Sequence, residues 1–200
     1  TVPNGISLIG DIQERIRLID SKGYEYKAKL TILKEAARTL NYLTENNLLQ
    51  YDDLEKKVED VHSSYDRTGK ELKAVEARLR EVQPLIKNIS NYQRLKPVYD
   101  AFQRAKDKPS FKAKHEAELV IFEAARSTLL AMQGEEKLPS LKTLQAEQQQ
   151  LLEEQQRLYD ERARLKKEVR MIDTMKANVD DFLKPSAEYD RDQQHSSQRE

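Results

Sequence analysis

The 200-residue chain contains no cysteine, no tryptophan and only five glycines. Without cysteine it forms no disulfide and no cysteine-ligated zinc site, and so few glycines argue against a glycine-rich nucleotide-binding loop. Hydrophobic residues make up 38% and charged residues 35%, which leaves little material for a compact core. No apolar run approaches the roughly 20 residues of a membrane-spanning helix, and no signal-peptide pattern is present. We therefore expect an elongated, cytoplasmic protein that does not enter a membrane.

The chain begins with Thr-Val-Pro, which suggests a fragment of a longer protein. A complete small protein that has lost its initiator methionine is the alternative. Its 35 basic and 35 acidic side chains cancel, so net charge indicates neither nucleic acid nor membrane as a partner. The distribution is less even, because residues 93–114 carry seven basic side chains against two acidic ones.

Two hydrophobic stripes with coiled-coil spacing dominate the pattern. The first advances by alternating steps of four and three residues, as heptad a and d positions do. Its members are Leu54, Val58, Val61, Tyr65, Thr68, Leu72, Val75, Leu79, Val82, Ile86 and Ile89. The second repeats every seven residues at Leu144, Leu151, Leu158, Leu165, Ile172 and Val179. Its companion heptad position holds Leu141, Gln148, Gln155, Arg162, Val169, Lys176 and Leu183, and the polar members indicate either control of register or a groove that faces a partner.

Periodicity together with glycine and proline placement predicts five helices. They are expected at residues 6–20, 24–46, 52–106, 110–134 and 141–183, with Asp52 and Ser110 capping the third and fourth. Pro84 and Pro97 each lack a backbone donor and clash with the preceding turn, so we expect a kink or short break near one of them.

The two stripes cover equal spans, which favours pairing between them within one molecule. The predicted fold is all-α: an elongated antiparallel coiled-coil hairpin in which facing residue numbers sum to about 233, with a helical base and a small helical tip. Its parts are the base at 1–50, the ascending arm at 51–89, the tip at 90–139, the descending arm at 140–184 and a disordered tail at 185–200. An intermolecular coiled coil, such as a homodimer, is the alternative.

The predicted tip combines basic and aromatic side chains. The basic members are Arg94, Lys96, Arg104, Lys106, Lys108, Lys112 and Lys114, and the aromatic members are Tyr92, Tyr99, Phe102 and Phe111. This composition is typical of surfaces that neutralise phosphates and stack on bases, so these residues are the candidate DNA-binding site. In the alternative interpretation the aromatic residues form the core of the tip and the basic residues simply face solvent. A second basic patch comprises Lys27, Lys29, Lys34 and Arg38.

Catalytic chemistry is not indicated. The chain has only three histidines, His62, His115 and His195. His62 and Asp66 share a helical face at a spacing that can hold a metal, but no third ligand is evident, and a solvated histidine is favoured. His115-Glu116 resembles the start of a zincin helix, yet the second histidine that this motif requires is replaced by Leu119. We therefore predict no catalytic residues, no metal and no cofactor, and a chain that is not itself an enzyme.

Five stretches in order carry a resemblance to a known family. They are Gly23-Tyr24-Glu25 through Leu48-Leu49-Gln50-Tyr51-Asp52, Asn91-Tyr92, His115-Glu116-Ala117-Glu118, Leu138-Pro139-Ser140-Leu141-Lys142-Thr143-Leu144, and Lys176-Ala177-Asn178-Val179-Asp180. Over about residues 5–183 the chain resembles the helical region that follows the nicking domain in relaxases of conjugative and mobilisable transposons. Pro84 departs from the long helix of that family.

The resemblance implies a non-catalytic C-terminal region of a DNA relaxase, acting in conjugative transfer and mobilisation. The family's nicking machinery, a tyrosine that attacks DNA phosphate and a histidine cluster that holds a metal, lies N-terminal to this region and has no counterpart here. The implied partners are DNA, including single-stranded DNA, the relaxase catalytic domain in cis, and an accessory or coupling protein of the relaxosome. The alternative function is a structural coiled-coil dimerisation rod without nucleic-acid contact.

Overall fold

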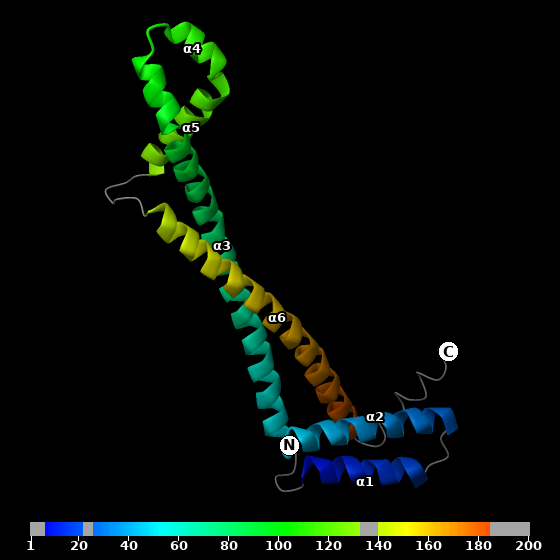
Figure 1. Ribbon diagram of the computed structural model, residues 1–200. Coiled ribbons are helices and arrows are strands. Elements are labelled where there is room, and N and C mark those ends of the chain that lie inside the picture. The colour runs from blue at the N-terminus through cyan, green and yellow to red at the C-terminus, as the bar shows by residue number, and fades with distance from the viewer. Residues whose placement is uncertain (1–6, 22–25, 133–139, 185–200) are drawn as a thin grey trace. The chain divides into compact units, whose positions relative to one another are not determined.

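The computed structural model describes residues 7–21, 26–132 and 140–184, and these ranges are almost entirely helical, with no strand (Figure 1). The helices are α1 (Leu8–Ser21), α2 (Tyr26–Glu45), α3 (Tyr51–Arg104), α4 (Lys108–Lys114), α5 (Glu116–Met132) and α6 (Leu141–Leu183). The all-α class predicted from the sequence is therefore confirmed. The helices belong to two compact units, one of residues 1–67 with 162–200 and the other of residues 68–161. The predicted tail at 185–200 lies outside the described residues, as do Gly23 and His195.

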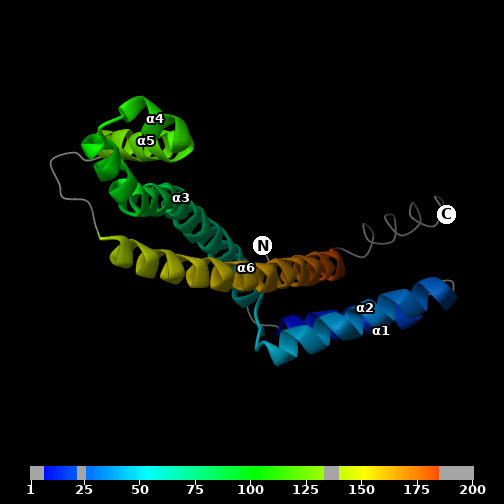
Figure 2. The same ribbon diagram turned by 45° about the horizontal axis from the view of Figure 1, so that its top comes forward.

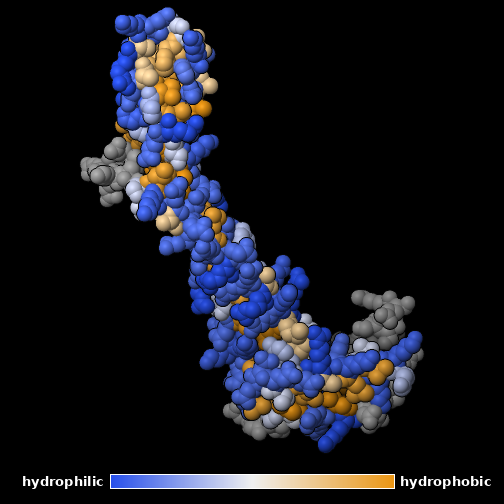
Figure 3. All heavy atoms as spheres, viewed as in Figure 1, coloured by the Kyte–Doolittle hydropathy of each residue, from blue (hydrophilic) through white to orange (hydrophobic). Residues whose placement is uncertain are grey.

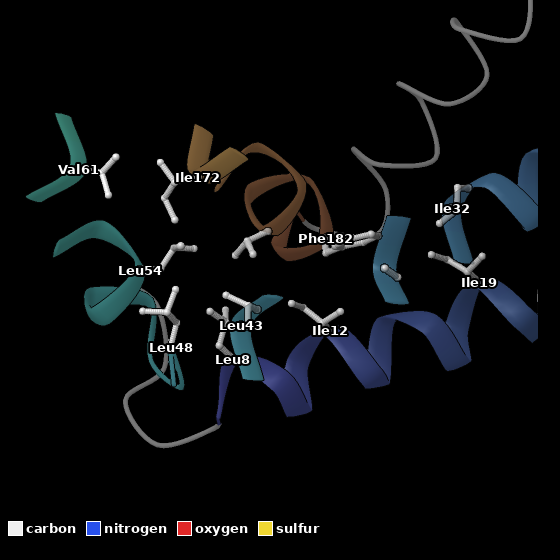
Figure 4. Packing of buried hydrophobic residues seen from close by; sticks show 12 residues of the cluster. Leu8, Ile12, Ile19, Ile32, Leu43, Leu48, Leu54, Val61, Ile172 and Phe182 are labelled. Carbon is white, nitrogen blue, oxygen red and sulfur yellow. The ribbon is translucent and has the colours of Figure 1, made fainter. Parts of the chain in front are cut away.

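The first unit has one hydrophobic core to which four helices contribute. Helices α1 and α2 lie side by side (Figures 1 and 2), and Figure 3 shows hydrophobic atoms along both of them. The core, seen from close by in Figure 4, contains Leu8, Ile12, Ile19, Ile32, Ala36, Leu43, Leu48, Leu54, Val61, Ile172, Val179 and Phe182. The buried face of α1 carries Leu8, Ile12 and Ile19. The buried face of α2 carries Ile32, Ala36, Thr39 and Leu43.

A left-handed residue closes α2 and turns the chain toward α3. Asn47 has a φ of 54°, a conformation that asparagine tolerates better than most residues. The Leu48 amide donates to the Leu43 carbonyl at 2.8 Å and the Asn47 amide to the Thr44 carbonyl at 3.1 Å. This is the Schellman pattern, and the buried Leu48 supplies its usual hydrophobic contact. The Leu8 amide then donates to the Leu49 carbonyl at 2.9 Å, which ties the start of α1 to this turn.

Helix α3 differs from the prediction at its start and at its prolines. The Gln50 amide donates to Asp53 Oδ2 at 3.2 Å, so the capping side chain is Asp53 rather than the predicted Asp52. The helix continues through Pro84 and Pro97, and the expected short break is absent. Both prolines are exposed, which lets the carbonyls that they leave unpaired face water.

The second unit contains one segment each of α3 and α6 together with the whole of α4 and α5. Its core comprises Val82, Ile89, Leu129 and Leu144, with Leu85, Ile86, Tyr92, Leu141 and Leu151 packed against it. The fourth predicted helix is in fact two helices that meet at His115. The cap was also misplaced, because the Asp107 side chain accepts from the Ser110 amide at 3.0 Å. Asp107 therefore caps α4, with Pro109 in the first turn, where its missing donor costs little.

Both heptad stripes point inward. Every member of the first stripe and of the second stripe is buried or half-buried, and all seven companion residues on α6 are half-buried. In the first unit, side-chain bonds join Tyr51 to Asp180 and Tyr65 to Arg162. In the second unit, they join Glu76 to Tyr159 and Arg78 to Glu147. Within each unit, α3 and α6 therefore run in opposite directions: as the residue number rises along α3, the number of the α6 residue that it contacts falls.

Candidate nucleic-acid interface

Six aromatic rings of the second unit pack into one cluster, which we call the ring cluster: Tyr92, Tyr99, Phe102, Phe111, His115 and Phe122. Phe122 on α5 stacks on Tyr92 at 5.1 Å and on Tyr99 at 4.5 Å, both distances between ring centroids. Phe102 is tilted against Phe111 at 6.2 Å, and Phe111 stacks on His115 at 4.5 Å. Phe122 is 2% exposed and the other five are half-buried. The ring cluster therefore joins α3, α4 and α5.

Phe122 and Arg126 are the parts of this arrangement that the sequence analysis missed. Phe122 shares its buried helix face with Leu119, Ala125 and Leu129, a 3–4 spacing that could have identified it as core. The Arg126 guanidinium lies 6.0 Å from the centroid of the Tyr99 ring, and its Nη1 donates to the Tyr99 hydroxyl at 3.4 Å.

All seven basic residues predicted for the tip are exposed. Four have partners of their own: Lys96 pairs with Asp100 at 3.1 Å, Arg94 bonds to Asn91, Arg104 donates to the Asp100 carbonyl, and Lys108 lies 5.9 Å from the Phe102 centroid. Lys106, Lys112 and Lys114 have no ion pair or hydrogen bond from their side chains to any other described residue. Lys108, Lys112 and Lys114 are all carried by the seven-residue α4.

The second basic patch lies in the first unit, on α2. Lys27, Lys34 and Arg38 are exposed, and Lys29 is half-buried. Arg38 Nη2 lies 3.5 Å from the Met171 sulfur of α6. The structure thus places this patch and the tip residues in different units.

The two histidines that the structure describes, His62 and His115, have carboxylate partners. His62 Nε2 lies 2.8 Å from Asp173 Oδ1, across α3 and α6 of the first unit, rather than facing Asp66 for a metal. His115 Nδ1 bonds to Glu118 within the second unit. Among the described residues, no three acidic or histidine side chains are grouped so as to hold a metal ion.

A polar cluster in the first unit was also not foreseen. The Tyr51 hydroxyl donates to Asp180 Oδ1 at 2.6 Å, and Lys176 Nζ bonds to both the Tyr51 hydroxyl and Asp180 while lying 4.6 Å from the Tyr51 ring centroid. Burial and the bond to Asp180 raise the pKa of Tyr51. Burial would lower the pKa of Lys176, but its bonds to Asp180 and Tyr51 outweigh that effect and raise it. Lys176, a polar residue at the companion heptad position, therefore connects α6 to α3 in this unit.

Within the described ranges, no helix is both long and apolar enough to cross a membrane. No protein-family model, curated protein or solved structure matches the chain.

Proposed function

We propose that this chain is the non-catalytic C-terminal helical region of a DNA relaxase, and that it binds DNA through the basic residues around α4 during conjugative transfer. The relaxase assignment rests on the ordered sequence stretches from Gly23 to Asp180. The DNA-binding assignment is supported above all by the exposure of seven basic side chains between Arg94 and Lys114 around the ring cluster. In this proposal α4 presents the lysines, and the ring cluster holds α4 against α3 and α5.

The charge balance of the segment supports contact with an anion. Of its two carboxylates, Asp100 pairs with Lys96 and Asp107 caps α4, so neither forms an ion pair with Lys106, Lys112 or Lys114. Unpaired, exposed lysines attract phosphates as point charges, and each phosphate contact releases counterions from DNA. Binding of this kind weakens as salt rises.

Salt titration of DNA binding tests the proposal. Charge reversal of four lysines, Lys106→Glu, Lys108→Glu, Lys112→Glu and Lys114→Glu, should abolish most of the affinity and flatten the dependence of affinity on salt. The matched control reverses four exposed lysines elsewhere: Lys73→Glu, Lys87→Glu, Lys166→Glu and Lys167→Glu. Equal losses in both variants, or an unchanged slope in the first, would refute a specific role for the α4 region.

A structural rod that dimerises without DNA is the second candidate, because α5 exposes large apolar side chains. Val120 is 58% exposed, Ile121 42% and Leu130 59%. Sedimentation of the chain with and without DNA separates the two functions: the DNA-binding arm is monomeric and shifts when DNA is added, whereas the rod is dimeric and does not shift. Docking of an accessory or coupling protein, or of the relaxase catalytic domain in cis, is a further part of the proposed role.

We also propose that α3 and α6 form one antiparallel coiled-coil hairpin inside a single molecule. The inward-facing stripes and the opposed numbering of contacting residues support it. The chain has no native cysteine, so Val61→Cys with Ile172→Cys, two core residues whose side chains point toward each other in Figure 4, should give an intramolecular disulfide. The control pair, Val61→Cys with Leu165→Cys, places the second thiol about 10 Å further along α6 and should not close. A bridge found only between chains would favour the intermolecular coiled coil.

A further inference from the structure

The rings of the proposed DNA-binding region already stack on one another. Phe122 is stacked with both Tyr92 and Tyr99, and Phe111 is stacked with His115. The remaining ring, Phe102, is tilted against Tyr99 at 6.4 Å and Phe111 at 6.2 Å, with Lys108 nearby. Phe122 is buried and the other five rings are half-buried. Stacking on a nucleic-acid base requires an accessible ring face, and in the ring cluster the neighbouring rings lie where a base would stack.

Moving a ring out to meet a base would also separate helices. Tyr92, Tyr99 and Phe102 belong to α3, Phe111 to α4 and Phe122 to α5, so the ring cluster is one of the contacts that hold these helices together. The pairs that already exist would have to break before a base could replace one of their members. The free energy gained from stacking on a base would thus be offset by the ring–ring contacts that are lost, with little net gain.

Unlike the rings, three of the basic side chains are available for a ligand. Lys106, Lys112 and Lys114 are exposed and have no ion-pair partner among the described residues. An ammonium group has no fork geometry with which to recognise a base edge, and it binds phosphate oxygen as a point charge. Arg94 and Arg104, the residues best suited to base recognition, each use one nitrogen within α3, Arg94 Nη2 for Asn91 and Arg104 Nε for the Asp100 carbonyl.

We propose, on the basis of the function proposed above, that this region contacts only the phosphate backbone and does not recognise bases. Its ligand class is any nucleic-acid strand, single or duplex, without preference for sequence. Its specificity for an origin of transfer then comes from another part of the relaxase. The ring cluster is a positioning element for the lysines and not a stacking platform.

The test compares four labelled probes of about 20 nucleotides, which exceeds common site sizes. They are oligothymidine, oligoadenosine, a single strand of abasic sites, and a mixed-sequence duplex, each titrated with the full chain at several salt concentrations. We expect the three single strands to bind within about twofold of one another. Lys106→Gln, Lys112→Gln and Lys114→Gln together should make the salt slope shallower by about 2.1 on single strands and about 2.7 on duplex.

A ring variant provides the complementary readout. Phe111→Leu keeps an apolar side chain on α4 but removes the aromatic face, and circular dichroism checks that its helix content is unchanged. We expect any change in its affinity to be the same, within about twofold, for oligothymidine and for the abasic strand, because the ring acts through the position of the lysines. A loss of about fivefold or more on oligothymidine with no loss on the abasic strand would overturn the backbone-only proposal while leaving DNA binding intact. Failure of every probe to bind at low salt would instead overturn DNA binding itself.

Discussion

Replacement of Ile172 by alanine tests the packing on which the first unit depends. Ile172 on α6 is fully buried and belongs to the core together with Leu54, Val61 and Val179. Figure 4 shows the Val61 and Ile172 side chains pointing toward each other. Ile172→Ala removes three carbon atoms, which is about 2.4 kcal/mol of lost transfer free energy at ~0.8 kcal/mol per group. The cavity left behind adds to this, so we expect a total loss of about 2.5–5 kcal/mol in the free energy of unfolding.

Urea unfolding followed by circular dichroism measures this loss. The midpoint should fall while the m-value stays constant, because the surface exposed on unfolding hardly changes. Ile172→Val should cost only about 0.5–1.5 kcal/mol. The control is Lys167→Ala on the exposed side of the same helix, which should change stability by less than about 0.5 kcal/mol. A loss below about 1 kcal/mol for Ile172→Ala, or one no larger than that of the control, would refute the packing of α6 against α3 in this unit.

Three further predictions concern polar contacts and proline. The pKa values of Tyr51 and Lys176 are raised in the folded state, so both groups contribute stability that is complete below a pH of about 10. This contribution is lost as pH rises through the folded-state pKa values. Tyr51→Phe should therefore flatten the alkaline part of the plot of unfolding free energy, measured with urea, against pH. Pro84→Ala should raise the free energy of unfolding by about 1–3 kcal/mol, because a backbone hydrogen bond is restored inside α3; no gain would show that the helix does not continue through this position. Glu147→Gln breaks the double contact with exposed Arg78 and should cost about 0.2–1 kcal/mol in urea titrations, less at high salt, whereas a larger, salt-independent loss would contradict a surface ion pair.

The basic side chains of the candidate site were predictable, but their surroundings were not. Seven lysines and arginines within one short segment are visible in the sequence, and their exposure follows from the cost of burying a charge. The sequence left two interpretations open for the aromatic residues. Phe122 favours packing, because it comes from α5 and stacks on Tyr92 and Tyr99 of α3. No local pattern shows which rings of different helices will meet.

The sequence by itself determined most of the helices and the inward faces of α3 and α6. Heptad spacing placed Leu54, Leu72 and Leu158 on buried stripes, and α6 begins and ends where the pattern predicts, because helical periodicity is a local property of the chain. Tertiary structure decided how α3 tolerates Pro84, since the free energy of a whole helix packed on its neighbours outweighs one lost hydrogen bond. It also decided the partners of polar residues such as Lys176, whose ammonium meets Tyr51 from a distant part of the chain. Contacts of that kind depend on which helix surfaces come together, and only folding brings them into reach.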